Sequence, residues 1–151
     1  MEQVVKINNH SFFDAVKESL AVGNQVKFRV VGNSMRPFLR EGDQVVIQEA
    51  NQHDYQRGAI LLAHWKDGYV LHRLVRYRGD FVWLAGDNNL VQLEQIPVEQ
   101  IIAVVVCAYR GEKRVLKQSF WVRIVGMLWF HARPLRIVGA KLIRLIRKEY
   151  V

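Results

Sequence analysis

The sequence has little of what marks a metal-binding, disulfide-bonded or membrane-spanning protein. Cys107 is the only cysteine, so no internal disulfide can form, and its apolar surroundings predict a position in the core. Five scattered histidines, without a CxxC pair or an HExxH motif, predict no metal site and no cofactor. No apolar run reaches the ~18 residues of a spanning helix, and the N-terminus lacks the apolar region of a signal peptide. With three prolines and 50% hydrophobic residues, the 151-residue chain is neither disordered nor collagen-like and can build one core.

Positive charge is present, but it is unevenly distributed along the chain. The formal net charge is +8, yet residues 1–112 contain 12 Lys and Arg against 13 acidic residues. Residues 113–151 contain ten Lys and Arg and one acid, Glu149. A basic protein can bind nucleic acid, an anionic membrane or an acidic polymer. Because the excess charge is confined to the tail, the tail is the segment that we expect to meet such a partner.

The pattern of the first 112 residues predicts a short helix followed by a β domain. In residues 1–23, Ser11 can cap a helix that stops at Gly23. Short β-rich runs then alternate with turn residues, which predicts a compact, mostly antiparallel β domain over residues 24–112. Asp67-Gly68 predicts a two-residue hairpin turn that places His64 and His72 on opposite faces of the sheet. The β-rich runs are residues 26–32, 43–48, 58–65, 69–77, 80–86 and 101–109.

Residues 113–151 predict a basic amphipathic tail. The pattern is helical from about Val115, and Pro134 divides it into two helices. In the second helix Leu135, Leu142 and similar residues fall on one arc, and the basic residues fall on the opposite one. This division favours helices that lie on an anionic membrane surface, so we expect peripheral association at the cytoplasmic face. The expected membrane contacts are Trp121, Trp129, Phe130, Arg136, Arg144 and Arg147.

Two other interpretations of the tail remain open. Its apolar residues could pack against the β domain or a partner protein, with the Lys and Arg side chains simply solvated. Nucleic acid is disfavoured because the apolar arc is too large for a helix that contacts phosphates, and no DNA-binding motif is visible.

The segment GNSMRPFLREGDQVVI, residues 32–47, predicts a catalytic site. Ser34 follows Gly32-Asn33 at the end of a strand, on a tight turn that can expose its hydroxyl and direct backbone N–H groups at an oxyanion. A nucleophilic serine needs a base, and the candidates on neighbouring strands are His64, Lys66 and His72. The residues alone leave this choice to geometry.

The ordered series GNSMRP, GDQVVI, RGAILLAHW, LHRLV and LAGDNN resembles the signal peptidase superfamily, which includes the self-cleaving SOS repressors. The resemblance spans about Val26 to Tyr109. Pro37 is typical of the signal peptidase branch. His72-Arg73 stands where bacterial signal peptidase I has Lys-Arg, which is similar to the Ser/His enzymes of the endoplasmic reticulum, archaea and some spore-forming bacteria.

This resemblance implies the fold and the roles of particular residues. It implies a mainly β, coiled β-barrel domain that binds substrate as an added strand. Ser34 would be the nucleophile and His72 the general base. Asp87, in the GDNN segment, would be the acid that orients His72, with Glu94 as the alternative. The implied oxyanion and substrate-binding residues are Asn33, Met35 and Pro37.

Together these observations predict a serine endopeptidase that removes signal or leader segments from exported proteins or peptide precursors at a membrane surface. One alternative is a self-processing regulator of the repressor branch, although no Ala-Gly bond precedes the first strand. The other is a non-catalytic binding module that keeps the fold and docks through its basic tail.

Overall fold

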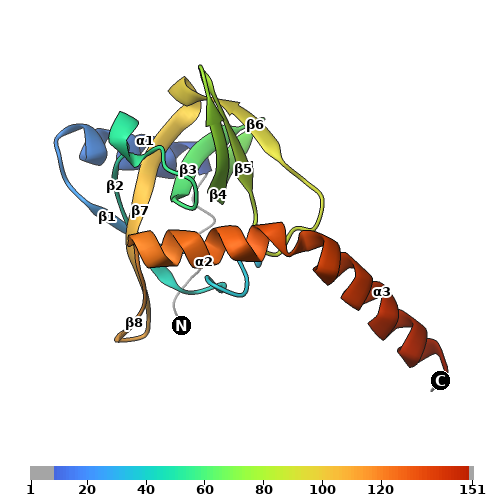
Figure 1. Ribbon diagram of the computed structural model, residues 1–151. Coiled ribbons are helices and arrows are strands. Elements are labelled where there is room, and N and C mark those ends of the chain that lie inside the picture. Colours follow the sequence, from blue (N-terminus) through green and yellow to red (C-terminus); the bar gives the residue numbers. More distant parts are fainter. Residues whose placement is uncertain (1–8, 150–151) are drawn as a thin grey trace.

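The computed structural model describes residues 9–149, which form a curled sheet with helices at both ends of the chain (Figure 1). Helix α1 covers Asn9–Ala21, and α2 (Phe120–His131) and α3 (Arg133–Glu149) follow the sheet. This architecture confirms the predicted mainly β fold; residues 1–8 of the predicted N-terminal segment lie outside the described residues. The strands are β1 (Val26–Arg29), β2 (Gln44–Glu49), β3 (Ile60–Trp65), β4 (Gly68–Arg78), β5 (Phe81–Ala85), β6 (Glu94–Pro97), β7 (Ile101–Arg110) and β8 (Lys113–Lys117), with 3₁₀ turns at Gln52–Asp54 and Val98–Gln100.

All strand pairs are antiparallel, in the order β1-β2-β7-β3-β4-β5-β6, with β8 paired to β7. The sheet curls into a half-barrel, as expected from the twist of its strands, and an apolar cluster lies on each of its two faces. Val16 and Leu20 of α1 pack into the first cluster with Ile47 of β2. The second cluster lies among β3 to β7 and includes Leu74 and Leu84. Leu74 lies on β4 and Leu84 on β5, and these two strands position the candidate site.

The β3–β4 hairpin differs from the prediction by one residue. Trp65 pairs with Gly68, so Lys66 and Asp67 form the turn, and Lys66 adopts a positive φ of 52°. The turn predicted at Asp67-Gly68 is therefore wrong. His64 and His72 still point to opposite faces, because they pair with Tyr69 and Leu61 and these positions alternate along the strands.

The tail begins with a strand rather than a helix. Residues 113–117 form β8, which adds to β7, so the helix expected from about Val115 starts at Phe120 instead. Ser119 caps α2 by accepting from the N–H of Val122. The predicted division near Pro134 agrees with the break between α2 and α3.

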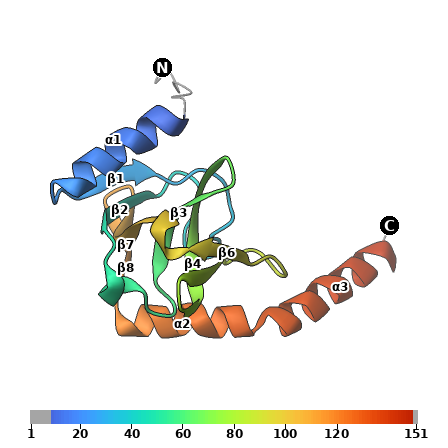
Figure 2. The same ribbon diagram turned by 90° about the horizontal axis from the view of Figure 1, so that it is seen from above.

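The two C-terminal helices have different surroundings. In both views α2 lies along the sheet, while α3 continues beyond the edge of the β domain (Figures 1 and 2). α2 packs closely: a Cβ on Gly58 would lie 2.5 Å from the Arg123 carbonyl oxygen, and a Cβ on Gly126 would overlap Arg73. None of the helices in residues 9–149 combines the length and apolar character needed to cross a membrane.

Candidate active site

Ser34 lies on the turn that follows β1, with its side chain exposed. Gly32 precedes it with φ +83°, a left-handed conformation that glycine adopts without strain. The side chains of Met35 and Leu39 are buried, and the N–H of Leu39 donates to the Met35 carbonyl at 2.9 Å. The turn is therefore anchored in the core on one side, which leaves the Ser34 hydroxyl accessible.

His72, on β4, lies between Ser34 and a buried carboxylate. Its Nε2 is 3.1 Å from Ser34 Oγ, and its Nδ1 is 3.0 Å from Oε2 of Glu94. An ionised carboxylate can only accept hydrogen bonds, so we assign the proton of the neutral imidazole to Nδ1. Nε2 is then free to accept the proton of Ser34, which is the arrangement of a nucleophile, a base and an orienting acid.

The strand register explains why Glu94 reaches His72. Leu84 of β5 pairs with Leu74 of β4 on one side and with Glu94 of β6 on the other. Paired residues of neighbouring strands direct their side chains to the same face, and His72 shares that face because it lies two residues from Leu74. Glu94 is 2% exposed, so little solvent competes for its hydrogen bond to the imidazole.

Asp87 lies on the opposite face, which corrects its expected role as the partner of His72. Ala85 pairs with Arg73, so Asp87, two residues further on, directs its carboxylate to the Arg73 side. Arg73 donates from Nε and Nη2 to the two carboxylate oxygens, at 2.7 Å each. The position beside Nδ1 of His72 belongs to Glu94, the alternative acid.

The Arg73–Asp87 pair is buried beneath α2. Arg73 is fully buried and also donates from Nη1 to the Gly58 carbonyl at 2.8 Å. Burial raises the pKa of Asp87, and the hydrogen bonds and positive charge of Arg73 offset that effect only in part. The Arg73 guanidinium lies directly against Gly126 of α2, so the pair has the character of a structural ion pair between the sheet and α2.

The remaining candidates on the β domain separate clearly in space. Asn33 and Pro37 are exposed beside Ser34, where they can face a ligand. The side chain of Met35 is 2% exposed and belongs to the core, so only its backbone can contribute to substrate binding. His64 meets Tyr69 edge-to-face, with ring centroids 5.2 Å apart, on the face opposite His72.

The six expected membrane contacts divide into two groups. Trp129 and Arg136 are half-buried and donate hydrogen bonds to the Asp87 carbonyl oxygen, at 2.7 and 2.9 Å. Phe130 is half-buried, and the guanidinium of Arg133 lies 4.5 Å from the centre of its ring. Trp129 and Arg136 therefore direct these hydrogen-bond donors to the β domain, and their contact with a membrane stays a prediction. Trp121, Arg144 and Arg147 are exposed.

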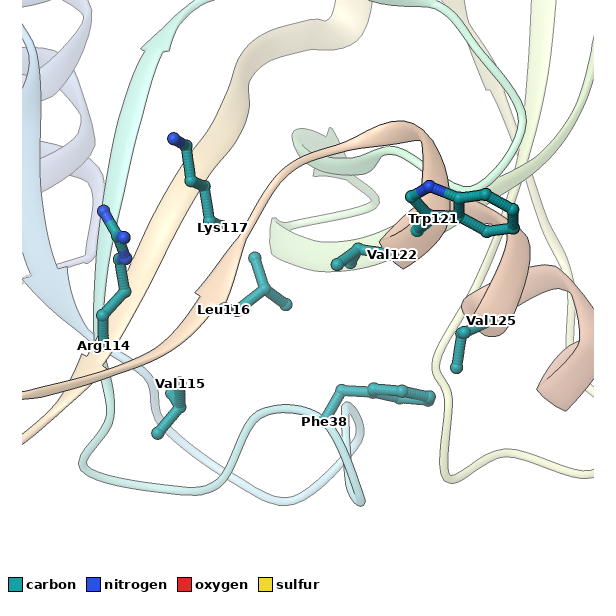
Figure 3. A pocket seen from close by; sticks show the side chains of 8 residues that line it. All are labelled: Phe38, Arg114, Val115, Leu116, Lys117, Trp121, Val122 and Val125. Atoms are coloured by element: carbon teal, nitrogen blue, oxygen red, sulfur yellow. The ribbon is translucent and has the colours of Figure 1, made fainter.

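An apolar groove lies beside residues 32–39, the turn that carries Ser34 and that we call the nucleophile turn. It has a volume of about 350 Å³ and lies between that turn, β8 and the first turns of α2. Figure 3 shows Phe38 reaching from the nucleophile turn toward Val125, with the charged ends of Arg114 and Lys117 pointing away from the apolar side chains. Leu116, Val115, Val122 and Trp121 complete the lining.

Residues 3–106 match the family model described as Peptidase S24-like, which is consistent with the superfamily of signal peptidases and self-cleaving repressors. This family is generally serine peptidase-like and includes non-catalytic members. No curated protein matches the chain. The matched residues include Ser34, His72 and Glu94, whereas β8, α2 and α3 lie beyond them.

Proposed function

The chain belongs to the Peptidase S24-like family, and from this premise we propose that it is a serine endopeptidase. Ser34 is the nucleophile, His72 the general base and Glu94 the acid that orients the base. The observation that carries the proposal is the continuous array of hydrogen bonds from an exposed serine hydroxyl through an imidazole to a buried carboxylate. Each group has the role that its position allows.

The proposed reaction proceeds through an acyl-enzyme. Ser34 Oγ bonds to the peptide carbonyl carbon as its proton passes to His72 Nε2, and that proton then goes to the leaving amine as the C–N bond breaks. Water hydrolyses the ester, with His72 again accepting and returning a proton. Glu94 accepts from Nδ1–H and stabilises the imidazolium. The backbone N–H of Ser34 is the first oxyanion donor; one such donor contributes about 2.7–4 kcal/mol in a well-studied protease.

The proposed substrates are signal or leader segments of exported proteins or peptide precursors. β1 is the last strand of the sheet order on its side and leads directly to the Ser34 turn. A substrate in extended conformation can add to the edge of β1 that pairs with no strand of residues 9–149, and bring a peptide bond to Ser34. The apolar groove beside Phe38 offers a contact for an apolar segment of the same substrate.

The exposed side of the helical tail supports attachment to an anionic membrane surface, for which we propose the cytoplasmic face. Trp121 of α2 and Leu135 of α3 are 72% and 76% exposed. Binding strength scales with the apolar area that such side chains bury in the interfacial region, up to about 1.5–3 kcal/mol for a fully buried side chain. Each Lys or Arg near anionic headgroups adds about 1 kcal/mol. The other exposed apolar side chains are Phe120, Val125, Leu128, Val138, Leu142, Ile143, Leu145 and Ile146, and the exposed basic ones in α3 are Lys141, Arg144, Arg147 and Lys148.

A fluorophosphonate probe tests the catalytic proposal without knowledge of the natural substrate. We expect the wild-type protein to be acylated at Ser34, as located by mass spectrometry of the labelled peptide. Ser34→Ala should abolish labelling, and His72→Ala should slow it by at least about 10³-fold, because the alkoxide is then formed without a base.

His64→Ala is the matched control, because His64 lies on the opposite face of the same hairpin and should leave the rate unchanged. A leader peptide with small residues before its cleavage site should be cut by the wild type and not by Ser34→Ala. Absence of labelling in a folded wild-type protein would favour the non-catalytic binding module instead.

Vesicle co-sedimentation of the full chain tests the membrane proposal. Leu142→Gln with Leu145→Gln removes apolar area at constant charge, and should weaken binding to vesicles with anionic lipid at both low and high salt. Arg144→Gln with Arg147→Gln should weaken binding mainly at low salt, because exposed charges are screened. Equal binding of all three proteins would count against the tail as the membrane contact.

A further inference from the structure

We propose that Trp129 and Arg136 are positioning residues of the peptidase. They act by holding one peptide group of the loop between β5 and β6, residues 86–93, which lies beside Ser34. The proposal rests on the proposed function of Ser34 and His72. It concerns residues beyond 3–106, so it assigns the helical tail a part in the reaction that the family match does not cover.

Both side chains bind the same carbonyl oxygen. Trp129 Nε1–H donates to the Asp87 oxygen at 2.7 Å, and Arg136 Nη1 donates to it at 2.9 Å. The Arg136 guanidinium lies 4.3 Å from the centre of the Trp129 ring, so the two donors support each other. Two donors use both lone pairs of a carbonyl oxygen. We call Trp129 and Arg136, in this arrangement, the carbonyl clamp.

The opposite end of the same peptide group binds the nucleophile turn. The bond between Asp87 and Asn88 is planar, so its C=O and N–H groups point in opposite directions and can rotate only together. The N–H of Asn88 donates to the Ser34 carbonyl oxygen at 2.9 Å. The carbonyl clamp therefore fixes the direction of the N–H group that holds Ser34. The polarised peptide group also strengthens that hydrogen bond.

Close packing makes the catalytic atoms sensitive to this loop. A Cβ at Gly86 would lie 2.8 Å from the Ser34 carbonyl oxygen and 3.2 Å from Nε2 of His72, so the loop has no free space on that side. The Trp129 ring also meets Phe38 of the nucleophile turn edge-on, with centroids 6.2 Å apart. A shift of the loop would change the distance between Ser34 Oγ and His72 Nε2, on which proton transfer depends.

Trp129→Phe tests the clamp because it retains an aromatic ring for packing and removes the N–H donor. Arg136→Met similarly retains much of the side chain and removes its donors. We expect each variant to be acylated by the fluorophosphonate about 3- to 10-fold more slowly than the wild type, and the double variant about 10- to 100-fold more slowly. Arg136→Lys, which keeps a donor, should restore part of the rate.

Three measurements separate positioning from a general loss of stability. In Trp129→Phe, which changes no charge, the acylation rate should fall at every pH while the midpoint of its pH profile stays at the wild-type value. Hydrogen exchange at the Asn88 amide should become faster in Trp129→Phe. Trp65→Phe, at the β3–β4 turn, and Arg78→Met, at the far end of β4, are matched controls that should change neither quantity.

The outcomes also distinguish this proposal from the proposed function. Wild-type acylation rates in a folded Trp129→Phe/Arg136→Met protein would overturn the positioning role and leave the peptidase intact. If the wild type itself is not acylated, the peptidase assignment fails, and the Asn88 amide alone decides the clamp. Faster exchange in the variants then supports a clamp on the loop, and unchanged exchange overturns it.

Discussion

Two neighbouring residues of β4 direct their side chains to opposite faces of the sheet and bind different carboxylates. His72 faces Ser34 and donates a hydrogen bond to Glu94. Arg73 faces α2 and donates two hydrogen bonds to Asp87. Both carboxylates are buried, but only the His72 face opens to an exposed hydroxyl. The difference shows that burial of a carboxylate is common to catalytic and structural pairs. The group that each side chain faces, the Ser34 hydroxyl for His72 and helix α2 for Arg73, distinguishes the two roles.

The largest expected effect is on the His72 face. Glu94→Gln keeps the shape of the side chain but can stabilise the imidazole tautomer with the proton on Nε2, which cannot accept from Ser34. We expect acylation of Ser34 to slow by about 10³- to 10⁴-fold, the size seen when the triad acid of a serine protease is made an amide. The loss in the free energy of unfolding should be much smaller than the rise in the activation free energy of acylation. The second-order rate constant for fluorophosphonate labelling provides the measurement.

Glu99→Gln is the matched control for that experiment, because Glu99 is exposed on the 3₁₀ turn after β6. If Glu94→Gln were acylated at the wild-type rate, Glu94 would have no orienting role and the two faces of β4 would not differ as described.

The second effect is on stability and belongs to the Arg73 face. Arg73→Met leaves Asp87 buried without its partner, and Asp87→Leu leaves a fully buried guanidinium, so each should lower the free energy of unfolding by about 3–5 kcal/mol. The double variant Arg73→Met/Asp87→Leu should lose less than the sum of the two, because neither charge then remains unpaired. Urea unfolding of the four proteins measures the coupling. Additive losses would show that the pair contributes no mutual stabilisation.

How far the sequence predicts this site depends on strand register. The β-rich runs predicted β1 to β5 and β7, because each of these strands contains several apolar side chains between turn residues. β6 and β8 are short and polar, EQIP and KRVLK, and were not predicted. Glu94 begins β6, so nothing in the sequence placed it beside β4. The resemblance led first to Asp87, which lies in the GDNN segment but follows β5 on the face opposite His72, and gave Glu94 only as the alternative.

The tail shows the same limit at the level of helices. Helical spacing identified its apolar and basic arcs, and Pro134 located the division. Helical spacing could not show which aromatic side chains of the tail contact the β domain, because these contacts join residues that are distant in sequence. One signal was available: Gly126 lies within an otherwise strongly helical and apolar run, and a glycine inside a helix often permits a close approach.

The third effect uses that glycine and measures how closely the Arg73 face is covered. Gly126→Ala would place a Cβ against the Arg73 guanidinium, which is held by Asp87 and cannot move easily, so we expect destabilisation of about 1–3 kcal/mol. Gly139→Ala in α3 is the matched control, because its Cβ would have no neighbour within 4 Å. That variant should be stabilised by up to about 1 kcal/mol, the ordinary gain for alanine in a helix. Equal thermal midpoints for the two variants would contradict the close packing of α2.

The smallest effect compares the Arg73–Asp87 pair with a second pair nearer the surface. Asp43 accepts two hydrogen bonds from Arg110, whose side chain is 40% exposed. Burial alone would raise the pKa of Asp43, but the hydrogen bonds from Arg110 and from the backbone of Arg40 outweigh it and lower the pKa below 3.8. The ionised carboxylate therefore adds stability above about pH 3.8, and this contribution is lost as the pH falls through the lowered pKa.

Asp43→Asn should accordingly flatten the acid limb of the stability curve below pH 3.8, with a smaller loss at neutral pH than Arg73→Met causes. For Asp87 the sign is opposite: its raised pKa means that the folded protein holds the proton more firmly than the unfolded chain does. Stability then falls as the pH rises from 3.8 through the raised pKa, and the double variant Arg73→Met/Asp87→Leu removes that slope. Urea unfolding between pH 3 and pH 7 measures both slopes. Parallel curves for the two variants would show that the two aspartates respond alike to the proton, and the contrast between the buried and the surface pair would fail.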